Sequence, residues 1–269
     1  LIPNTAEVAF YGLLKGMEDY LNKIKVQRII SWGKDYDEEK LAEMINRRIR
    51  VEKIANKDVK MRTFITEDVS RNELVQHVYD ITYGSIRKGE DTVVVIDDSI
   101  VRGTTLRESI IKMLSRLEPK RIIIVSSAPQ IRYPDCYGID MSKMNDFIAF
   151  QAAILLIREQ KMDHLLQDLY NKCRELERNS QLHTENVVRN SYKPFTAEDI
   201  SKKIAQLITP SDVSIPVDVI YQTIEDLHES CPTNTGDWYF TGNYPTPGGN
   251  KVVNKAFINF MEGKNIRGY

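Results

Sequence analysis

The chain has 269 residues, of which 42% are hydrophobic and 28% charged, and its formal net charge at pH 7 is −1. These values predict a soluble globular protein of one large or two modest domains. A near-neutral charge argues against a nucleic-acid or membrane surface, and no apolar run approaches the roughly 18 residues of a membrane span. Three cysteines without a CxxC pair (Cys136, Cys173 and Cys231) argue against a disulfide framework and favour a reducing cytoplasm.

The first part of the chain alternates between helical and strand-like patterns. Apolar residues recur at helical spacing over 8–24, the short run 26–31 is strand-like, and 37–49 is again helical. Residues 57–72 are polar and lack clear periodicity, as expected of a mobile loop. A helix is expected over 73–86.

The middle of the chain predicts a strand–helix–strand unit. Residues 92–96 and 121–126 are apolar runs typical of strands, and 106–117 is helical between them. A crossover of this length favours parallel pairing with a right-handed connection. Ligands of such sheets lie beyond the carboxyl ends of the strands, where Asp97 and Ser127 would both emerge.

The last part of the chain is mostly helical in pattern. Residues 142–179 carry helical periodicity, and a further helix is predicted to begin with Thr196 as its cap and Asp199 three residues later. Residues 245–249, Pro-Thr-Pro-Gly-Gly, are interpreted as a turn or loop.

The most informative segment is the nine-residue string 97–105, Asp-Asp-Ser-Ile-Val-Arg-Gly-Thr-Thr. An apolar strand delivers two acids to its tip, and a small-residue turn then opens a helix. The acids can accept the hydroxyls of a sugar diol, and the free N–H groups of the helix start can hold a phosphate. Gly103 allows close approach of the backbone. The alternative for the acids alone is a surface turn with an Asp/Ser cap.

This string resembles the phosphoribosyl pyrophosphate (PRPP) signature of the type I phosphoribosyltransferases, and its flanks resemble the glutamine amidophosphoribosyltransferases. Residues 1–6 resemble that family's pyrophosphate loop, and 62–65 its mobile catalytic loop. Residues 127–134 and 137–141 resemble the stretch beyond its next strand. The likeness covers roughly residues 1–150, and 217–247 more weakly.

The resemblance implies an α/β fold with a type I phosphoribosyltransferase-like parallel sheet flanked by helices and a mostly helical C-terminal extension. We expect a transferase domain at 1–160 with a truncated first strand, a helical insertion at 161–210, and a C-terminal segment at 211–269 that packs on the transferase domain. The family's N-terminal glutaminase domain is expected to lie outside this chain. None of the three cysteines is therefore offered as its nucleophile.

The resemblance also assigns roles to individual residues. Asp97 and Asp98 would accept the ribose hydroxyls, favour the developing cation at C1 and reach Mg²⁺ directly or through water. The 5-phosphate would be bound by the end of the signature, and the pyrophosphate by the N-terminal loop, whose alternative is an ordinary helix cap. The full set predicted to contact PRPP is Asn4, Thr5, Ala6, Asp97, Asp98, Ser99, Arg102, Gly103, Thr104 and Thr105.

Arg62 is the predicted catalytic cation, which would neutralise the leaving pyrophosphate when the loop closes. Its alternative is an ordinary solvated loop arginine. The chain departs from the family here, because Gln76, His77 and Val78 stand where many members carry a basic run, and Val59 stands at a tyrosine position. The departure either weakens PRPP closure or leaves the task to Lys57, Lys60 or Arg71.

Some family members hold an iron–sulfur cluster, and this chain lacks the matching thiols. Asp135 follows Pro134 where a cysteine is expected, and Gly236 and Tyr239 occupy the positions of a CxxC pair. We therefore predict no iron–sulfur cluster, with Mg²⁺ as the expected cofactor. Ser127, Tyr137 and Asp140 lie on loops that could line either a nucleotide effector site or an ammonia channel.

The implied activity is displacement of pyrophosphate from PRPP by glutamine-derived ammonia to form 5-phosphoribosylamine, the first committed step of purine synthesis. The resemblance implies purine nucleotides as feedback inhibitors and a homo-oligomer, and the near-neutral charge predicts no nucleic-acid or membrane partner. One alternative is a sensor that binds PRPP or a nucleotide without catalysis. Another is salvage transfer to a purine or pyrimidine base, which leaves 127–134 and 137–141 unexplained.

Overall fold

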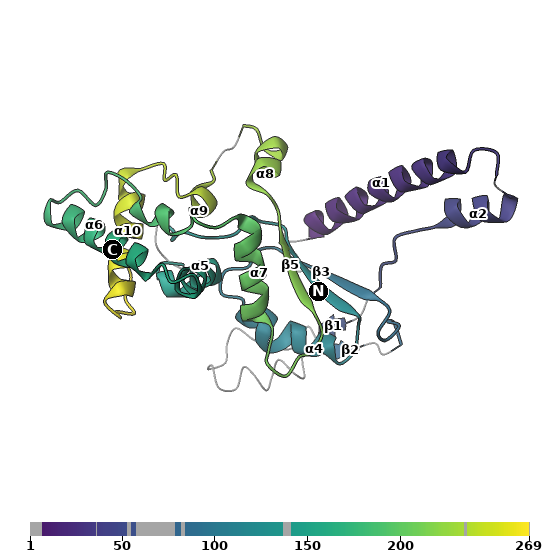
Figure 1. Cartoon of the computed structure of the whole chain (residues 1–269), viewed down its shortest axis with the longest axis horizontal. Helices are drawn as coiled ribbons and strands as arrows, with labels where there is room; N and C mark the ends of the chain where they lie inside the picture. The colour runs from purple at the N-terminus through teal and green to yellow at the C-terminus, as the bar shows by residue number, and fades with distance from the viewer. Residues whose placement is uncertain are drawn as a thin grey trace.

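The computed structural model describes residues 7–35, 37–52, 55–57, 79–81, 84–136, 141–233 and 236–268. Figure 1 shows a central sheet flanked by helices, a second group of helices packed beside it, and an arm formed by α1 (Glu7–Trp32) and α2 (Glu38–Asn46). No helix within the described ranges has the length and apolar character needed to cross a membrane.

The central sheet consists of three parallel strands in the order β3-β4-β5. The strands are β3 (Thr92–Asp97), β4 (Arg121–Ser126) and β5 (Val217–Tyr221). Asp97 pairs with Ser126, and Ser126 pairs with Tyr221, so the carboxyl ends of all three strands lie at one edge. The predicted α/β class and the parallel pairing of the first two strands are confirmed.

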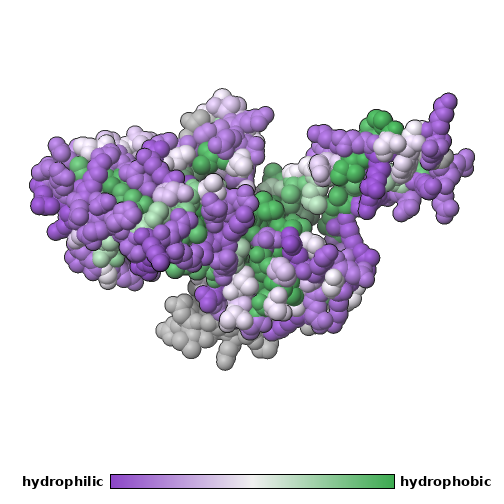
Figure 2. All heavy atoms as spheres, viewed as in Figure 1, coloured by the Kyte–Doolittle hydropathy of each residue, from purple (hydrophilic) through white to green (hydrophobic). Residues whose placement is uncertain are grey.

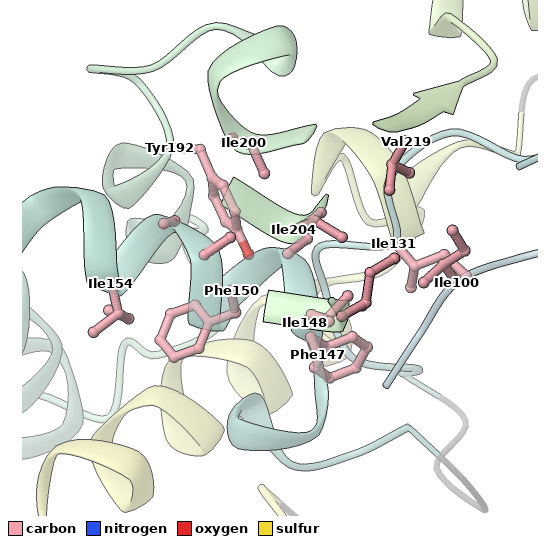
Figure 3. Packing of buried hydrophobic residues seen from close by; sticks show 14 of the residues in the cluster. Ile100, Ile131, Phe147, Ile148, Phe150, Ile154, Tyr192, Ile200, Ile204 and Val219 are labelled. Carbon is pink, nitrogen blue, oxygen red and sulfur yellow. The ribbon is translucent and has the colours of Figure 1, made fainter. Parts of the chain in front are cut away.

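One face of this sheet forms the core of the molecule. Val93, Ile122, Ile124 and Val219 are each at most 8% exposed and belong to one hydrophobic cluster. Helical backbone over 104–115 contributes to the same cluster through η2 (Leu106–Ile110), a π-helical segment, and α4 (Ile111–Ser115). The helix α7 (Ala197–Ile208) packs against β5 and α5 (Ile148–Glu159), and Figure 3 shows Ile204 between Ile200 and Ile148.

The other face of the sheet is more open within the described ranges. Val94 is 41% exposed and Ile220 is 52% exposed, and Figure 2 shows hydrophobic residues at the surface in this part of the molecule. Parallel sheets usually bury both faces. In this sheet, by contrast, the side chains of β3 alternate between exposed and buried over the first half of the strand.

The second group of helices packs around an aromatic cluster. The helix α6 (Asp163–Arg178) contacts α5, α10 (Pro247–Met261) and η4 (Val187–Ser191). Phe150 packs edge to face on Phe257 and Phe260, with ring centroids 6.2 and 4.9 Å apart. Shorter elements complete this region: η3 (Met144–Asp146), α8 (Ile224–Ser230) and α9 (Trp238–Thr241). The mostly helical character expected of this region is confirmed.

Two predictions for the N-terminal region are wrong. Residues 26–31 belong to α1 and form no strand, since the first helix-ending glycine is Gly33, whose φ is +59°. A helix is expected over 73–86, but Tyr79–Ile81 forms the strand β2, which pairs antiparallel with β1 (Ala55–Lys57), while residues 73–78 and 82–83 lie outside the described residues. The helix expected over 37–49 is confirmed as the shorter α2, with Asp37 as its N-cap.

The C-terminal region holds one further correction and one confirmation. Pro247, Gly248 and Gly249 form the first turn of α10 and no loop, because proline at the start of a helix is already in helical conformation. The predicted cap of α7 is confirmed as a capping box. The Thr196 hydroxyl accepts from the Asp199 N–H at 3.1 Å, and the Asp199 carboxylate accepts from the Thr196 N–H at 3.0 Å.

Candidate functional site

The acids of the signature lie at the carboxyl edge of the sheet, next to the start of the loop that follows β4. The Ser127 N–H donates to the Asp97 carbonyl at 2.9 Å, and the Ser127 hydroxyl donates to the Asp98 carbonyl at 3.0 Å. The carboxylates accept from the following backbone, Asp97 from the Asp98 N–H at 3.1 Å and Asp98 from the Ser99 N–H at 2.8 Å. Asp97, Asp98 and Ser127 are therefore joined in one constellation.

Burial makes Asp97 unusual among the acids of this edge. Desolvation, together with the negative charge of Asp98, raises the pKa of Asp97 to about 6. A carboxylate in this environment is stabilised by any group that supplies a hydroxyl donor or a cation. Perturbed carboxyl groups of this kind are concentrated at functional sites.

The second half of the signature is a turn held against the core. Gly103 has φ of +71°, and a Cβ built there would lie 2.7 Å from Ile148 Cδ1 and 2.8 Å from Ile208 Cγ2. The Ile148 N–H donates to the Val101 carbonyl at 2.8 Å, which fixes the turn to the start of α5. Helical backbone begins at Thr104, and Thr104 and Thr105 are both exposed. The turn thus presents a helix start and two hydroxyls to solvent, as phosphate binding requires.

Arg102 is less available to a ligand than the rest of the turn, because an acid of the protein already binds its guanidinium. Its guanidinium donates to the Asp146 carboxylate at 3.0 Å, and it is 54% exposed. A phosphate that recruited this guanidinium would compete with Asp146 for it. The backbone of Gly103–Thr105 is therefore the more available phosphate ligand.

Tyr221 is a residue of this edge that the sequence pattern did not single out. It ends β5, beside Ser126, and its buried hydroxyl has no hydrogen-bond partner within the described residues. Burial and the charge of Asp97 both raise the pKa of Tyr221 well above its usual range. In the sequence, the available signal for Tyr221 was an aromatic hydroxyl at the last position of an aliphatic strand. That Tyr221 shares an edge with Asp97 could be known only from the order of the strands in the sheet.

The other predicted site residues lie outside the described residues. These are Asn4, Thr5 and Ala6 of the pyrophosphate loop, Arg62 of the catalytic loop, and Tyr137 and Asp140. Gln76, His77 and Val78 lie outside as well. The roles assigned to all of these residues stay predictions, as do those of the signature residues and Ser127.

The signature acids offer the kind of ligands that Mg²⁺ prefers. Carboxylate oxygens combined with substrate phosphates and water form typical magnesium sites. The described residues hold no group of three or more His, Cys, Asp or Glu side chains that could bind a metal without such additional ligands. Two adjacent acids at a predicted phosphate site fit Mg²⁺ in this shared mode.

The same fit test applies to the cysteines. Cys136 is partly buried, Cys173 is buried with its Sγ 3.8 Å from Asn254 Oδ1, and Cys231 is exposed. The absence of an iron–sulfur cluster stays a prediction from the sequence.

Comparison with curated proteins finds similar segments in amidophosphoribosyltransferases. The chain is 49% identical to that of Pasteurella multocida over 61 residues, which is 23% of this chain and 12% of the relative. It is 37% identical to that of Schizosaccharomyces pombe over 93 residues, which is 33% of this chain and 17% of the relative. With the Escherichia coli protein it shares 43% identity over 70 residues, 26% of this chain and 14% of the relative.

The resemblance to the amidophosphoribosyltransferases is confirmed. The matched segments span less than a fifth of the length of these relatives. A solved structure, the glutamine PRPP amidotransferase of B. subtilis in complex with ADP and GMP, is similar with a TM-score of 0.40 and 24% identity, over 72% of this chain and 32% of that chain. No family model matches the chain.

Proposed function

We propose that this chain is the phosphoribosyltransferase part of a glutamine amidophosphoribosyltransferase. The reaction is displacement of pyrophosphate from PRPP by ammonia, which forms 5-phosphoribosylamine, the first committed step of purine synthesis. The observation that carries the proposal is the placement of Asp97 and Asp98 beside the Gly103–Thr105 turn at the carboxyl edge of a parallel sheet. One edge thereby offers both sugar-binding acids and a phosphate-binding helix start.

The proposed mechanism divides the substrate among three groups of residues. The backbone of the Gly103–Thr105 turn, with the two threonine hydroxyls and Arg102, binds the 5-phosphate, and Ser99 stands at the start of the same loop. Asp97 and Asp98 accept the ribose hydroxyls. Their negative charge stabilises the oxocarbenium-like C1 as the bond to pyrophosphate breaks and ammonia attacks.

The leaving pyrophosphate requires positive charge and an ordered loop. Asn4, Thr5 and Ala6 are proposed to bind it through the backbone, and Arg62 to neutralise it after loop closure. Mg²⁺ held by Asp97 and Asp98, directly or through water, would neutralise the pyrophosphate further. The buried hydroxyl of Tyr221, which has no hydrogen-bond partner within the described residues, is proposed to donate to a ligand oxygen at this edge.

The proposed partners follow from the same family. Ammonia would come from a glutaminase domain, purine nucleotides would inhibit at or beside the PRPP site, and the protein would assemble as a homo-oligomer. Ser127 is hydrogen-bonded to Asp98, so a nucleotide bound at this loop would lie close enough to the acids to compete with PRPP.

A second candidate function is a sensor that binds PRPP or a nucleotide and has lost catalysis. The observation that favours it is the replacement of the family's basic loop residues by Gln76, His77 and Val78. Loss of positive charge there would reduce stabilisation of the leaving pyrophosphate while leaving the signature intact. The two candidates therefore differ in turnover and agree in PRPP binding.

Both candidates are tested by one pair of assays on the chain with PRPP and Mg²⁺. Binding is measured by calorimetry, and turnover by release of pyrophosphate on addition of ammonium. We expect Asp98→Asn to reduce turnover at least about 100-fold, the scale expected when a charge facing a transition state is removed. Asp168→Asn is the matched control, because Asp168 is an exposed acid of α6.

Binding with no turnover in the wild-type chain would favour the sensor. Absence of PRPP binding in the wild-type chain and in Asp168→Asn would contradict both candidate functions. Equal loss of turnover in Asp98→Asn and Asp168→Asn would remove the acids of the signature from the mechanism.

A further inference from the structure

A polar cavity lies where η4, the turn after α9 and the start of α10 meet. Its volume is about 490 Å³, and its lining includes Asn186, Arg189, Asn190, Lys193, Gly242 and Asn250. None of the residues of the signature string 97–105 lines it. The volume falls within the range of sites for small molecules. We call it the Asn186 pocket.

The wall of the Asn186 pocket is held by a fully buried asparagine. The Asn254 amide N–H groups donate to the carbonyls of Leu182 at 2.9 Å and Glu185 at 2.7 Å. Its carbonyl oxygen accepts from the Val187 N–H at 3.1 Å. This side chain therefore fixes the segment that carries Asn186 before any ligand arrives, which lowers the entropy lost on binding.

The turn after α9 closes against the same wall. Gly242 has φ of +73°, and a Cβ built there would lie 2.5 Å from Asn186 Nδ2. Asn186 Nδ2 donates to the Gly242 carbonyl at 3.1 Å. Only glycine permits this approach, so the two segments are held together by shape as well as by a hydrogen bond.

Two positive charges in the lining are not neutralised by the protein. Arg189 and Lys193 are exposed and form no ion pair within the part of the chain that the structure describes. The acid of the lining, Glu185, is paired with Lys172 at 2.7 Å. The Asn186 pocket therefore attracts an anion, and two cations in one lining match the charge of a phosphate.

The asparagines of the lining supply acceptors. Asn186, Asn190 and Asn250 each donate their amide N–H to a backbone carbonyl, those of Gly242, Val187 and His183 at 3.1 to 3.2 Å. The buried Oδ1 of Asn186 has no hydrogen-bond partner within the described residues. A buried acceptor without a donor is unfavourable, and a ligand hydroxyl would satisfy it.

We propose that the Asn186 pocket binds a phosphorylated polyol of the size of a sugar phosphate. Arg189 and Lys193 bind the phosphate, and the asparagine oxygens accept the hydroxyls. This site is separate from the PRPP site of the proposed function and does not depend on it. The Asn186 pocket also gives a role to part of 161–210, the segment that the sequence pattern predicts to be an insertion.

The test is calorimetric titration of the whole chain with ribose 5-phosphate, inorganic phosphate and ribose as separate probes. We expect ribose 5-phosphate to bind more tightly than phosphate, and ribose to give no measurable binding. The double variant Arg189→Gln/Lys193→Gln should weaken ribose 5-phosphate binding at least about tenfold, since two charge-assisted hydrogen bonds are removed. Both side chains are exposed, so the variant should retain the wild-type melting temperature.

Two controls locate the binding. Arg116→Gln/Lys120→Gln makes the same change of charge at exposed positions before β4 and should leave binding unchanged. Gly103→Ala displaces the backbone of the signature turn and should retain the component of binding that the first double variant loses. Loss of ribose 5-phosphate binding in Gly103→Ala but not in Arg189→Gln/Lys193→Gln would assign the binding to the signature turn and overturn the proposal.

Three further results would overturn it as well. The first is equal weakening in the Arg116/Lys120 control, which would mark non-specific charge attraction. The second is phosphate binding as tightly as ribose 5-phosphate, which would remove the role of the asparagines. The third is no binding of any probe.

Discussion

The signature turn and the Asn186 pocket are built in opposite ways. The signature turn comes from one continuous segment, 97–105, and its position is fixed by apolar contacts of Gly103 with Ile148 and Ile208. The Asn186 pocket is assembled from two regions far apart in the chain, 184–193 and 242–250, and its wall is fixed by hydrogen bonds of the buried Asn254. A continuous motif can be recognised in a sequence, whereas a pocket assembled by tertiary packing cannot.

The two regions also differ in the charged and hydrogen-bonding groups that the protein leaves without a favourable partner. At the sheet edge the unfavourable groups are negative or neutral: the desolvated carboxyl of Asp97 and the unpartnered hydroxyl of Tyr221. In the Asn186 pocket they are the cations Arg189 and Lys193 and the amide oxygen of Asn186. The first set is suited to hydroxyls and Mg²⁺, and the second to a phosphate with hydroxyls.

The largest effect on stability is expected from Asn254→Ala, which tests the hydrogen-bonded wall. The change leaves two carbonyls and the Val187 N–H unpaired in the interior and should lower the free energy of unfolding by about 3 kcal/mol. Urea denaturation measures it. Asn250→Ala is the control, because Asn250 donates one hydrogen bond at a more open position and should lose about 1 kcal/mol or less. Equal losses would mean that Asn254 does not hold the wall.

A smaller loss is expected from Gly103→Ala, which tests the apolar support of the signature turn. The new Cβ would meet Ile148 and Ile208 and would force alanine into a left-handed conformation, at a total cost of about 2 to 3 kcal/mol. Gly263→Ala is the matched control, since Gly263 has φ of +67° and nothing within 4 Å of a new Cβ. It should lose only about 1 kcal/mol, from backbone strain. Thermal melting distinguishes the two, and a similar loss in both would show that the turn is not packed against the core.

An effect with the opposite sign is expected from Asp97→Asn. Because the pKa of Asp97 is raised to about 6 in the folded protein, its ionisation disfavours folding above pH 6. This penalty decreases as the pH falls from 6 towards the ordinary aspartate pKa of about 3.9 and is absent below it. The variant should therefore melt at a higher temperature than the wild type at pH 8 and at an equal temperature near pH 3.5. A melting temperature that exceeds that of the wild type equally at pH 8 and pH 3.5 would contradict the raised pKa of Asp97.

Local patterns in the sequence predicted those elements that local residues determine. The strands ending at Asp97 and Ser126, their parallel pairing and the Thr196–Asp199 capping box all follow from short-range periodicity and cap chemistry. The interpretation of 26–31 as a strand was wrong because an apolar β-branched run also continues a helix when no breaker precedes it.

Other features depend on partners that are distant in sequence. β2 exists because Tyr79–Ile81 pairs with β1, which is more than twenty residues earlier. Tyr221 joins the candidate site only because β5 lies beside β4. The Asn186 pocket similarly requires η4, Gly242 and α10 to come together. None of these contacts carries a local signature, so sequence patterns alone could not predict them.

The most direct test of the central claim is ³¹P NMR of PRPP incubated with the chain, Mg²⁺ and ammonium. The account predicts that the PRPP resonances are replaced by those of free pyrophosphate and a 5-phosphate product, that omission of ammonium prevents the replacement, and that Asp98→Asn abolishes it while Asp168→Asn does not. Unchanged PRPP resonances with the wild-type chain, under conditions where PRPP binding is saturated, would contradict the proposed transferase activity.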